Sequence, residues 1–318
     1  MSQFSVKVID KVQEAEDIVS LELAGLNAQP LLPFTAGAHI EVQLPGGMVR
    51  QYSLWNDPSQ HHCYRIGVLR DPASRGGSVA IHDQIKVGDT LRISEPINNF
   101  ALVPARRTLL FAGGIGVTPI LCMARHLAQS DASFEMHYCT RSPERTAFHD
   151  RIMKSSFADK VQFHFDNGAA EQKLNLADVI AVPDSGTHIY VCGPLGFIEY
   201  VTRTAKGRGW PDGQVHLEYF TGAQQDSAQD TAFEVELDST GETFLIPPGR
   251  SITTVLAEHG VYIPVSCEEG ICGTCLTGVL KGTPDHRDLY LTDKEHAKND
   301  QFTPCCSRSK DGKLVLDI

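Results

Sequence analysis

The chain has 318 residues, of which 42% are hydrophobic and 21% charged, as expected of a globular protein with two or three domains. Its net charge of −11 argues against nucleic-acid binding, which needs a basic surface. No run of 18 apolar residues predicts a membrane span, and the N-terminus lacks the apolar stretch of a secretory signal. We therefore expect a cytoplasmic protein with neither nucleic acid nor membrane as a partner.

Alternating apolar and polar residues predict several short strands in residues 1–103. The predicted strands lie at 4–8, 39–44, 65–69 and 90–93, with a Pro-Gly-Gly turn at 45–47 and one helix at 78–85. Many short strands joined by turns indicate a small antiparallel β-barrel.

Two motifs in this first segment predict a site for a phosphorylated ligand. One ends a strand and offers a cation, an aromatic ring and a hydroxyl, and the other is a glycine pair that opens the predicted helix, where backbone N–H groups bind phosphate. A solvated arginine and a core tyrosine explain the first motif alone equally well. Their occurrence together favours a ligand. The residues are Arg50, Tyr52 and Ser53 in the first motif and Arg75, Gly76, Gly77 and Ser78 in the second.

Strands alternate with helices in residues 104–226, the pattern of a doubly wound parallel α/β sheet. The predicted strands lie at 108–112, 134–139, 161–165 and 188–192, and the first helix lies at 119–127. A glycine-rich turn at 113–119, Gly-Gly-Ile-Gly-Val-Thr-Pro, joins the first strand to this helix. Such a turn binds phosphate at a helix N-terminus.

This turn alone is a weak signal for a dinucleotide, because proline replaces the last glycine of the G-x-G-x-x-G pattern. A second turn, Cys192-Gly193-Pro194, strengthens it, because both turns belong at the carboxyl edge of the sheet. Gly114, Gly116 and Thr118 are the candidate residues of the first turn. Asp166, after the strand at 161–165, is a candidate ligand for ribose hydroxyls that would favour NADH, and a simple turn residue is an equally good interpretation.

A small, polar segment at 223–230 is typical of a linker, and the third part of the chain, 227–318, begins within it. A hairpin at 233–237 and 243–246 and a helix at 251–259 are predicted before a cysteine-rich loop. From residue 228 onward 15 acidic residues stand against 8 basic ones, a balance that can steer docking to a basic partner.

Cys267, Cys272 and Cys275 have the C-x4-C-x2-C spacing of a plant-type [2Fe–2S] ferredoxin. The fourth ligand stands far along the chain, and spacing alone does not choose between Cys305 and Cys306. A zinc site is the alternative, but structural zinc sites pair two short knuckles and only one C-x2-C is present. Gly270 and Gly273 supply the backbone freedom that a loop around a cluster needs.

A [2Fe–2S] cluster takes one electron, whereas NADH gives up two as hydride. A flavin exchanges both, so the phosphorylated ligand of the first segment is predicted to be FMN, which has one terminal phosphate. The three expected cofactors are therefore FMN, NADH and the [2Fe–2S] cluster.

These motifs, in this order along nearly the whole chain, resemble the phthalate dioxygenase reductase family, and most closely its vanillate demethylase reductase subgroup. The resemblance implies a flavin-binding β-barrel at 1–103, an NAD domain at 104–226 and a ferredoxin domain of the β-grasp type at 227–318. It implies that Arg50, Gly77 and Ser78 bind the FMN phosphate and that Tyr52 and Ser53 contact the flavin ring.

The same resemblance implies roles for further residues. Gly67, Val68 and Leu69 would lie along the ring, Thr118 and Cys192 near the nicotinamide, and Phe220 would shield the flavin until NADH arrives. Because the family's last cysteine precedes a residue-Ser-Arg run, Cys305 becomes the expected fourth ligand.

The predicted function is the reductase component of a two-component Rieske oxygenase, a mono- or dioxygenase, with the oxygenase component as its partner. The electrons pass from NADH to FMN to [2Fe–2S] and then to that partner. A diaphorase that serves another acceptor is one alternative, and a zinc-stabilised nucleotide sensor is a non-enzymatic one. The final substrate binds the partner, so vanillate-like ethers, phthalates and quaternary amines such as carnitine all stay open.

Overall fold

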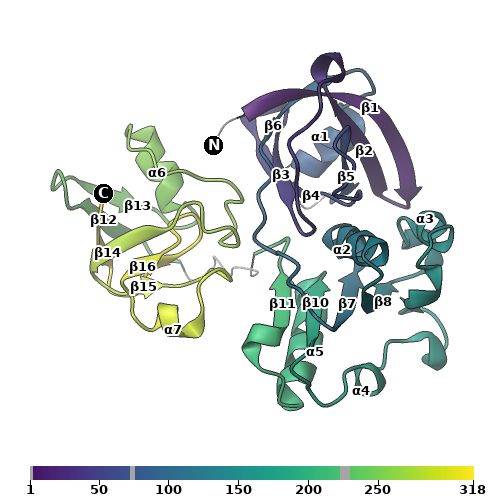
Figure 1. Cartoon of the computed structure of the whole chain (residues 1–318). Coiled ribbons are helices and arrows are strands. Elements are labelled where there is room, and N and C mark those ends of the chain that lie inside the picture. Colours follow the sequence, from purple (N-terminus) through teal and green to yellow (C-terminus); the bar gives the residue numbers. More distant parts are fainter. Residues whose placement is uncertain (1–2, 72–75, 223–229) are drawn as a thin grey trace. The chain divides into compact units, whose positions relative to one another are not determined.

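The computed structural model describes residues 3–71, 76–222 and 230–318, which form two compact units, Met1–Phe220 and Thr221–Ile318 (Figure 1). Arg75 and most of the predicted linker at 223–230 lie outside the described residues. Among the described residues, unit 1 holds two sheets, and unit 2 holds a five-stranded sheet and the two-stranded sheet β15-β17. The division at 103/104 into separate flavin and NAD domains stays a prediction.

The first sheet of unit 1 is antiparallel, with the strand order β4-β3-β6-β1-β2-β5. It curls until its two edges approach, where Leu54 and Ile66 form a bridge and the Trp55 N–H donates to the Arg65 carbonyl at 3.0 Å. The predicted small antiparallel barrel is confirmed, with a seam held by one bridge. Its strands are β1 (Gln3–Ala15), β2 (Ile18–Gly25), β3 (His39–Gln43), β4 (Val49–Ser53), β5 (Cys63–Leu69) and β6 (Thr90–Ser94).

Helix α1 (Gly77–Asp83) crosses one end of this sheet, close to the predicted bounds of 78–85. Its carboxyl end is fixed by Lys11, whose ammonium donates to the carbonyls of Ile81, His82 and Ile85 at 2.7–2.9 Å. A cation there satisfies carbonyls that have no partner inside the helix and complements the helix dipole. Lys11 therefore anchors the carboxyl end of α1 to β1.

The second sheet of unit 1 is parallel, with the order β11-β10-β7-β8-β9 (Figure 1). This confirms the predicted doubly wound α/β sheet, to which the structure adds β11 as an edge strand. The strands are β7 (Arg107–Gly113), β8 (Ser133–Thr140), β9 (Val161–Phe165), β10 (Thr187–Cys192) and β11 (Val215–Glu218); the helices are α2 (Val117–Gln129), α3 (His149–Met153), α4 (Leu176–Val179) and α5 (Leu195–Gly207).

Alternation along β7 assigns its side chains to two different cores. Leu110 and Ala112 pack in the core that contains α2, whereas Leu109 and Phe111 pack in the core that contains α4 and α5. The strand is apolar from Leu109 to Ala112 because both of its faces are covered there. Helices therefore lie on both faces of the sheet, as predicted.

Helix α2 also packs against the barrel, so the two sheets of unit 1 share one hydrophobic core. The Cys122 thiol donates to the Asn56 carbonyl at 3.2 Å. A Cβ on Gly67 of β5 would come within 2.9 Å of the Thr118 methyl group. Glycine is needed at this point because β5 and the start of α2 approach so closely.

Unit 2 is a mixed sheet of order β13-β12-β18-β14-β16 covered by one helix, α6, in agreement with the predicted ferredoxin domain. The predicted hairpin is confirmed at its predicted bounds. The elements are β12 (Phe233–Leu237), β13 (Thr243–Ile246), α6 (Ile252–Glu258), β14 (Thr277–Lys281), β15 (Pro284–Asp285), α7 (Asp293–His296), β16 (Gln301–Phe302), β17 (Arg308–Ser309) and β18 (Lys313–Leu316).

Arg308 is a buried cation that ties three segments of unit 2 together. Its guanidinium donates to the carbonyls of Thr231, Pro247 and Arg250 at 2.9–3.1 Å and forms an ion pair with Asp230. Asp230 is thus fixed in unit 2 although it lies in the predicted linker. No helix in the described part of the chain is long and apolar enough to cross a bilayer.

Candidate functional site

The glycine-rich turn and the Cys192-Gly193-Pro194 turn meet at the carboxyl edge of the parallel sheet. The two turns follow the neighbouring strands β7 and β10. From β7 the chain continues to β8 on one side, and from β10 it continues to β11 on the other side, so the turns lie at the topological switch point of the sheet. A Cβ on Gly116 would overlap the Cys192 carbonyl and come within 2.6 Å of the Gly193 nitrogen. The two turns are therefore packed backbone against backbone.

Gly114 faces the open side of this junction. It has φ +53°, and a Cβ built there would contact nothing within 4 Å. The N-terminus of α2 follows at once, where Pro119 fits in the first turn. An open, left-handed glycine before a helix N-terminus is suited to a pyrophosphate, so the turn fits the nicotinamide dinucleotide.

Thr118 and Cys192 are both buried beside this turn. The Thr118 hydroxyl donates to the Ile115 carbonyl at 3.1 Å, and its methyl group faces Gly67. Burial raises the pKa of the Cys192 thiol, with a further contribution from Glu218, so this cysteine stays protonated at neutral pH. The structure thus brings Gly67, Thr118 and Cys192 to one junction between barrel and parallel sheet.

Glu218 is a residue of this junction that the sequence analysis missed. It ends β11, is paired in register with Cys192, and accepts a hydrogen bond from the Ser53 hydroxyl at 3.5 Å. Burial raises its pKa to about 8. No local sequence signal marks it, because the pairing of β11 with β10 is a long-range contact. The arrangement brings an uncharged acid, a hydroxyl and a thiol together where the two sheets meet.

We expect Glu218→Gln to flatten the pH dependence of unit 1 stability. The folded pKa of Glu218 lies above the unfolded value of about 4.5, so the wild type loses stability as the pH rises from about 4.5 to 8. The glutamine keeps the Ser53 hydrogen bond without a charge. At pH 8 the variant should have a free energy of unfolding higher than that of the wild type by on the order of 1–2 kcal/mol, and it should therefore unfold at a higher temperature. Thermal release of flavin fluorescence from pH 5 to 9 measures this. Equal pH slopes for both proteins would contradict it.

The two phosphate motifs of the barrel come together at the N-terminus of α1. A Cβ on Gly77 would lie 2.7 Å from Cγ and 2.9 Å from Nε of Arg50, so this side chain lies directly on the start of the helix. Gly76 before it has φ +87°. A guanidinium beside the positive end of a helix is favourable when an anion sits between them, which fits the FMN phosphate. The Ser78 hydroxyl bonds to the backbone of Asp71, at 3.1 and 3.3 Å.

The remaining flavin candidates line the same side of unit 1. Tyr52 and Leu69 are half-buried against the shared core, as is Phe220, which follows β11. Burial raises the pKa of Tyr52, so its ring is neutral. Val68 is fully buried and points into the barrel core. Gly67 is buried as well, against Thr118 and Phe148, so of these three residues only Leu69 is partly exposed.

Asp166 is the one NAD candidate that the structure leaves apart from the turns. It is exposed after β9, and β8 stands between β9 and β7. Its backbone N–H donates to the Thr140 carbonyl at 3.0 Å. It lies at the same edge of the sheet as the glycine-rich turn, two strands away.

Four cysteines of unit 2 gather around one point. The Cys267 thiol is hydrogen-bonded to those of Cys272 and Cys305, and Cys305 is bonded to Cys275 as well. Hydrogen bonds from Cys272 and Cys305, together with backbone N–H groups of the loop, lower the pKa of Cys267. Four converging sulfur atoms with N–H donors aimed at them fit a [2Fe–2S] cluster.

The neighbouring Cys306 lies differently. Its thiol is 3.2 Å from the Thr303 hydroxyl and 3.8 Å from that of Ser307, and it occupies the space in which a Gly270 Cβ would stand. The Cys306 thiol also contacts that of Cys305, but Cys305 contacts Cys267 and Cys275 as well. This geometry favours Cys305 as the fourth ligand and explains why a second thiol can stand beside it.

The loop that carries the cysteines depends on its glycines, as predicted. Gly270 and Gly273 have φ +72° and +71°, a conformation that glycine adopts without strain. A segment at 288–290 lies across the loop: the Leu289 N–H donates to the Gly270 carbonyl at 3.0 Å, and the Tyr290 ring fills the position where a Gly273 Cβ would stand. We call residues 286–296 the cover segment.

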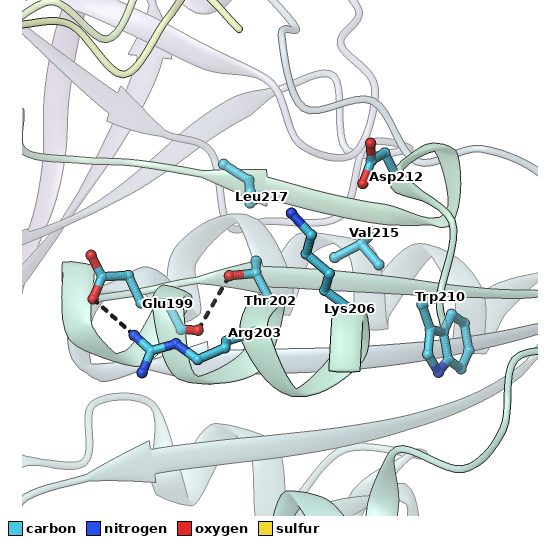
Figure 2. A pocket seen from close by; sticks show the side chains of 8 residues that line it. All are labelled: Glu199, Thr202, Arg203, Lys206, Trp210, Asp212, Val215 and Leu217. Atoms are coloured by element: carbon cyan, nitrogen blue, oxygen red, sulfur yellow. Dashed lines mark hydrogen bonds and ion pairs between the residues drawn. The ribbon is translucent and has the colours of Figure 1, made fainter. Parts of the chain in front are cut away.

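A separate pocket of unit 1 lies between α5 and β11 (Figure 2). Arg203 points along α5 toward Glu199, 3.8 Å away, and the Thr202 hydroxyl donates to the Glu199 carbonyl. None of the predicted site residues lines this pocket, so it is not the candidate site.

Comparison with known proteins gives two matching families. A 2Fe-2S iron-sulfur cluster binding domain matches residues 235–310, and an oxidoreductase NAD-binding domain matches residues 110–203. Vanillate O-demethylase oxidoreductase of Pseudomonas sp. (strain HR199 / DSM 7063) is 55% identical, over 96% of either chain. Phthalate dioxygenase reductase of Burkholderia cepacia is 41% identical over 98% of this chain and 97% of its own.

The solved structure of a phthalate dioxygenase reductase, a modular structure for electron transfer from pyridine nucleotides to [2Fe-2S], matches with a TM-score of 0.82. It is 39% identical and covers 100% of this chain and 98% of its own. The likeness thus extends over both units.

Proposed function

The chain belongs to the oxygenase reductase family that includes vanillate O-demethylase oxidoreductase and phthalate dioxygenase reductase, and within it we propose a reductase that serves a vanillate-type O-demethylase. The protein is an NADH-dependent iron–sulfur flavoprotein oxidoreductase. It passes electrons from NADH through FMN and a [2Fe–2S] cluster to the oxygenase component. The observation that carries the function is the presence, in one chain, of the switch-point turns, the Arg50–Gly77 cradle and the four converging cysteines.

Residues of the chain itself would bind and orient the three cofactors. Arg50 and the first N–H groups of α1 would hold the FMN phosphate. Ser53 and the neutral Glu218 would fix polar edges of the flavin and nicotinamide rings without adding a charge that repels hydride. FMN supplies the conversion between hydride and single electrons. Phe220, half-buried against the shared core, would cover the flavin, and Cys267, Cys272, Cys275 and Cys305 would hold the cluster.

The vanillate-type partner is favoured by degree of similarity. The chain is 55% identical to a vanillate O-demethylase oxidoreductase, against 41% for a phthalate dioxygenase reductase. The excess of acidic residues in the last third would meet a basic docking surface on the oxygenase. We also propose a cytoplasmic location, because none of the nine cysteines, all of which the structure describes, forms a disulfide, as in a reducing compartment.

We expect this reductase to reduce a purified vanillate-type Rieske oxygenase at least about 10-fold faster than a phthalate-type oxygenase or cytochrome c, since partners that do not match lose charge complementarity. The measurement is NADH-driven reduction of each acceptor under anaerobic, single-turnover conditions. Raising the salt concentration should lower the preferred rate most. Equal rates with all three acceptors would instead support a general diaphorase.

A further inference from the structure

We propose that unit 2 contains a second metal site, formed by His286, Asp288 and His296, which takes a divalent transition-metal ion such as Zn²⁺. One potential ligand atom from each residue lies within 4.8 Å of the other two. His286 follows β15, and His296 ends α7, so both belong to the cover segment. These residues are distinct from the four cysteines.

The distances between the ligand atoms already suit a metal ion. Asp288 carboxylate oxygens lie 3.2 Å from Nε2 of His296 and 3.8 Å from Nδ1 of His286. Tetrahedral zinc with bonds of about 2.0–2.2 Å places its ligands about 3.3–3.5 Å apart. The two distances to Asp288 bracket this range, and the two histidine nitrogens lie within 4.8 Å of each other with their rings stacked, so the rings must turn toward a shared ion to complete the site.

Outer hydrogen bonds orient two of the ligands as metal sites require. Nε2 of His286 is 3.2 Å from Oδ1 of Asn299, and an Asp288 oxygen accepts from the Leu291 N–H at 2.8 Å. Metal-bound histidines donate their second N–H to such an acceptor. With its proton on Nε2, His286 aims the lone pair of Nδ1 at the Asp288 carboxylate.

The Nδ1 lone pair of His286 is the strongest evidence for a cation site. Nδ1 of His286 is buried without a hydrogen-bond partner in the part of the chain that the structure describes, and its side chain is only 8% exposed. A network held by hydrogen bonds alone leaves a nitrogen lone pair facing carboxylate oxygens, which is unfavourable in a buried site. A divalent cation between them satisfies both.

The donor set selects the class of metal. Two imidazole nitrogens and one carboxylate favour zinc and neighbouring transition metals over Mg²⁺ and Ca²⁺, which prefer oxygen ligands. The His296 side chain is 24% exposed, which gives the ion an entry path and leaves room for a water as fourth ligand.

A metal here would act on the cysteine loop. The cover segment is bonded to that loop through Leu289 and Gly270, and Asp288 packs against Gly270, whose Cβ would lie 2.9 Å from that of Asp288. Binding would join the two ends of the cover segment and hold it over the loop. We infer that the ion slows loss of the cluster.

The test is calorimetric titration of ZnCl₂ into the full chain with flavin and cluster loaded, so that the cysteines are occupied. We expect one site with a micromolar or tighter Kd and no binding of MgCl₂. His296→Gln should weaken Zn²⁺ binding at least about 10-fold. His62→Gln is the matched control, because Glu22, His62 and Cys63 form the other such cluster among the described residues; it should bind as the wild type does.

The visible spectrum shows whether each variant retains its flavin and cluster. Should His296→Gln lose the cluster, His296→Asp, which keeps a ligand, should retain both the cluster and measurable Zn²⁺ binding. In the wild type, Zn²⁺ should also slow thermal bleaching of the cluster. The proposal fails if the wild type binds no Zn²⁺, if His62→Gln rather than His296→Gln removes the site, or if no variant at 296 changes the affinity.

Discussion

Cys275→Ser is expected to abolish electron delivery to the oxygenase while NADH still reduces the flavin. Cys275 is 3% exposed and contacts Cys305, so a serine there removes a ligand from the centre of the cysteine set. Electron transfer to the acceptor should fall at least about 100-fold, because no cluster is assembled. The proposed flavin site lies in unit 1, so flavin reduction by NADH should stay within about twofold of wild type. Iron analysis and stopped-flow absorbance measure both steps.

Two neighbouring substitutions are controls for this experiment. Cys305→Ser should behave like Cys275→Ser, whereas Cys306→Ser should keep the cluster, because its thiol is bonded to Thr303 and Ser307 hydroxyls. Loss of iron from Cys306→Ser alone would reassign the fourth ligand. If Cys275→Ser kept its FMN but lost flavin reduction, the order of transfer from NADH to FMN to cluster would be wrong.

Gly116→Ala is expected to disable the NADH site through a single methyl group. Its backbone conformation is ordinary, so the effect is steric: the new Cβ would overlap the Cys192 carbonyl and approach the Gly193 nitrogen, neither of which can turn aside. Separating the two turns misplaces the nicotinamide, and a misplacement of about 1 Å costs on the order of 100-fold in rate. Stopped-flow reduction of the flavin by NADH measures this loss.

Gly196→Ala is the matched control in the helix that follows the second turn. Gly196 lies in α5, and a Cβ there contacts nothing within 4 Å. Alanine favours a helix over glycine by up to about 1 kcal/mol, so this variant should be at least as stable as wild type and equally active. Wild-type flavin reduction in Gly116→Ala would show that the turns do not position the nicotinamide.

Most of the fold could be predicted from local patterns. The β9 strand and the β12–β13 hairpin have the predicted bounds because alternation and turn residues act within a few positions. β11 was missed because Val215–Glu218 is only four residues long and half-exposed, and its pairing with β10 is a long-range contact. The two-residue strands of unit 2 were missed for the same reason.

The sequence predicts the site residues that belong to one local motif. It does not predict those whose role depends on a contact between distant segments. The cysteine spacing identifies three ligands, but the choice of Cys305 depends on which thiol faces the others after folding. Glu218 could not be found from sequence, since its raised pKa comes from burial between two sheets that are far apart in the chain. The contact between Arg50 and Gly77 likewise exists only in the folded barrel.

The core that α2 shares with both sheets determines which parts of this chain can be inherited separately. Recombination between related genes near residue 103 would join a barrel to a foreign α2, and the pairs Asn56–Cys122 and Gly67–Thr118 would no longer match. Recombination after Phe220 divides no such core, because the cluster-binding residues pack among themselves. Exchange after Phe220 would therefore keep the barrel and the parallel sheet together and replace unit 2 as a whole.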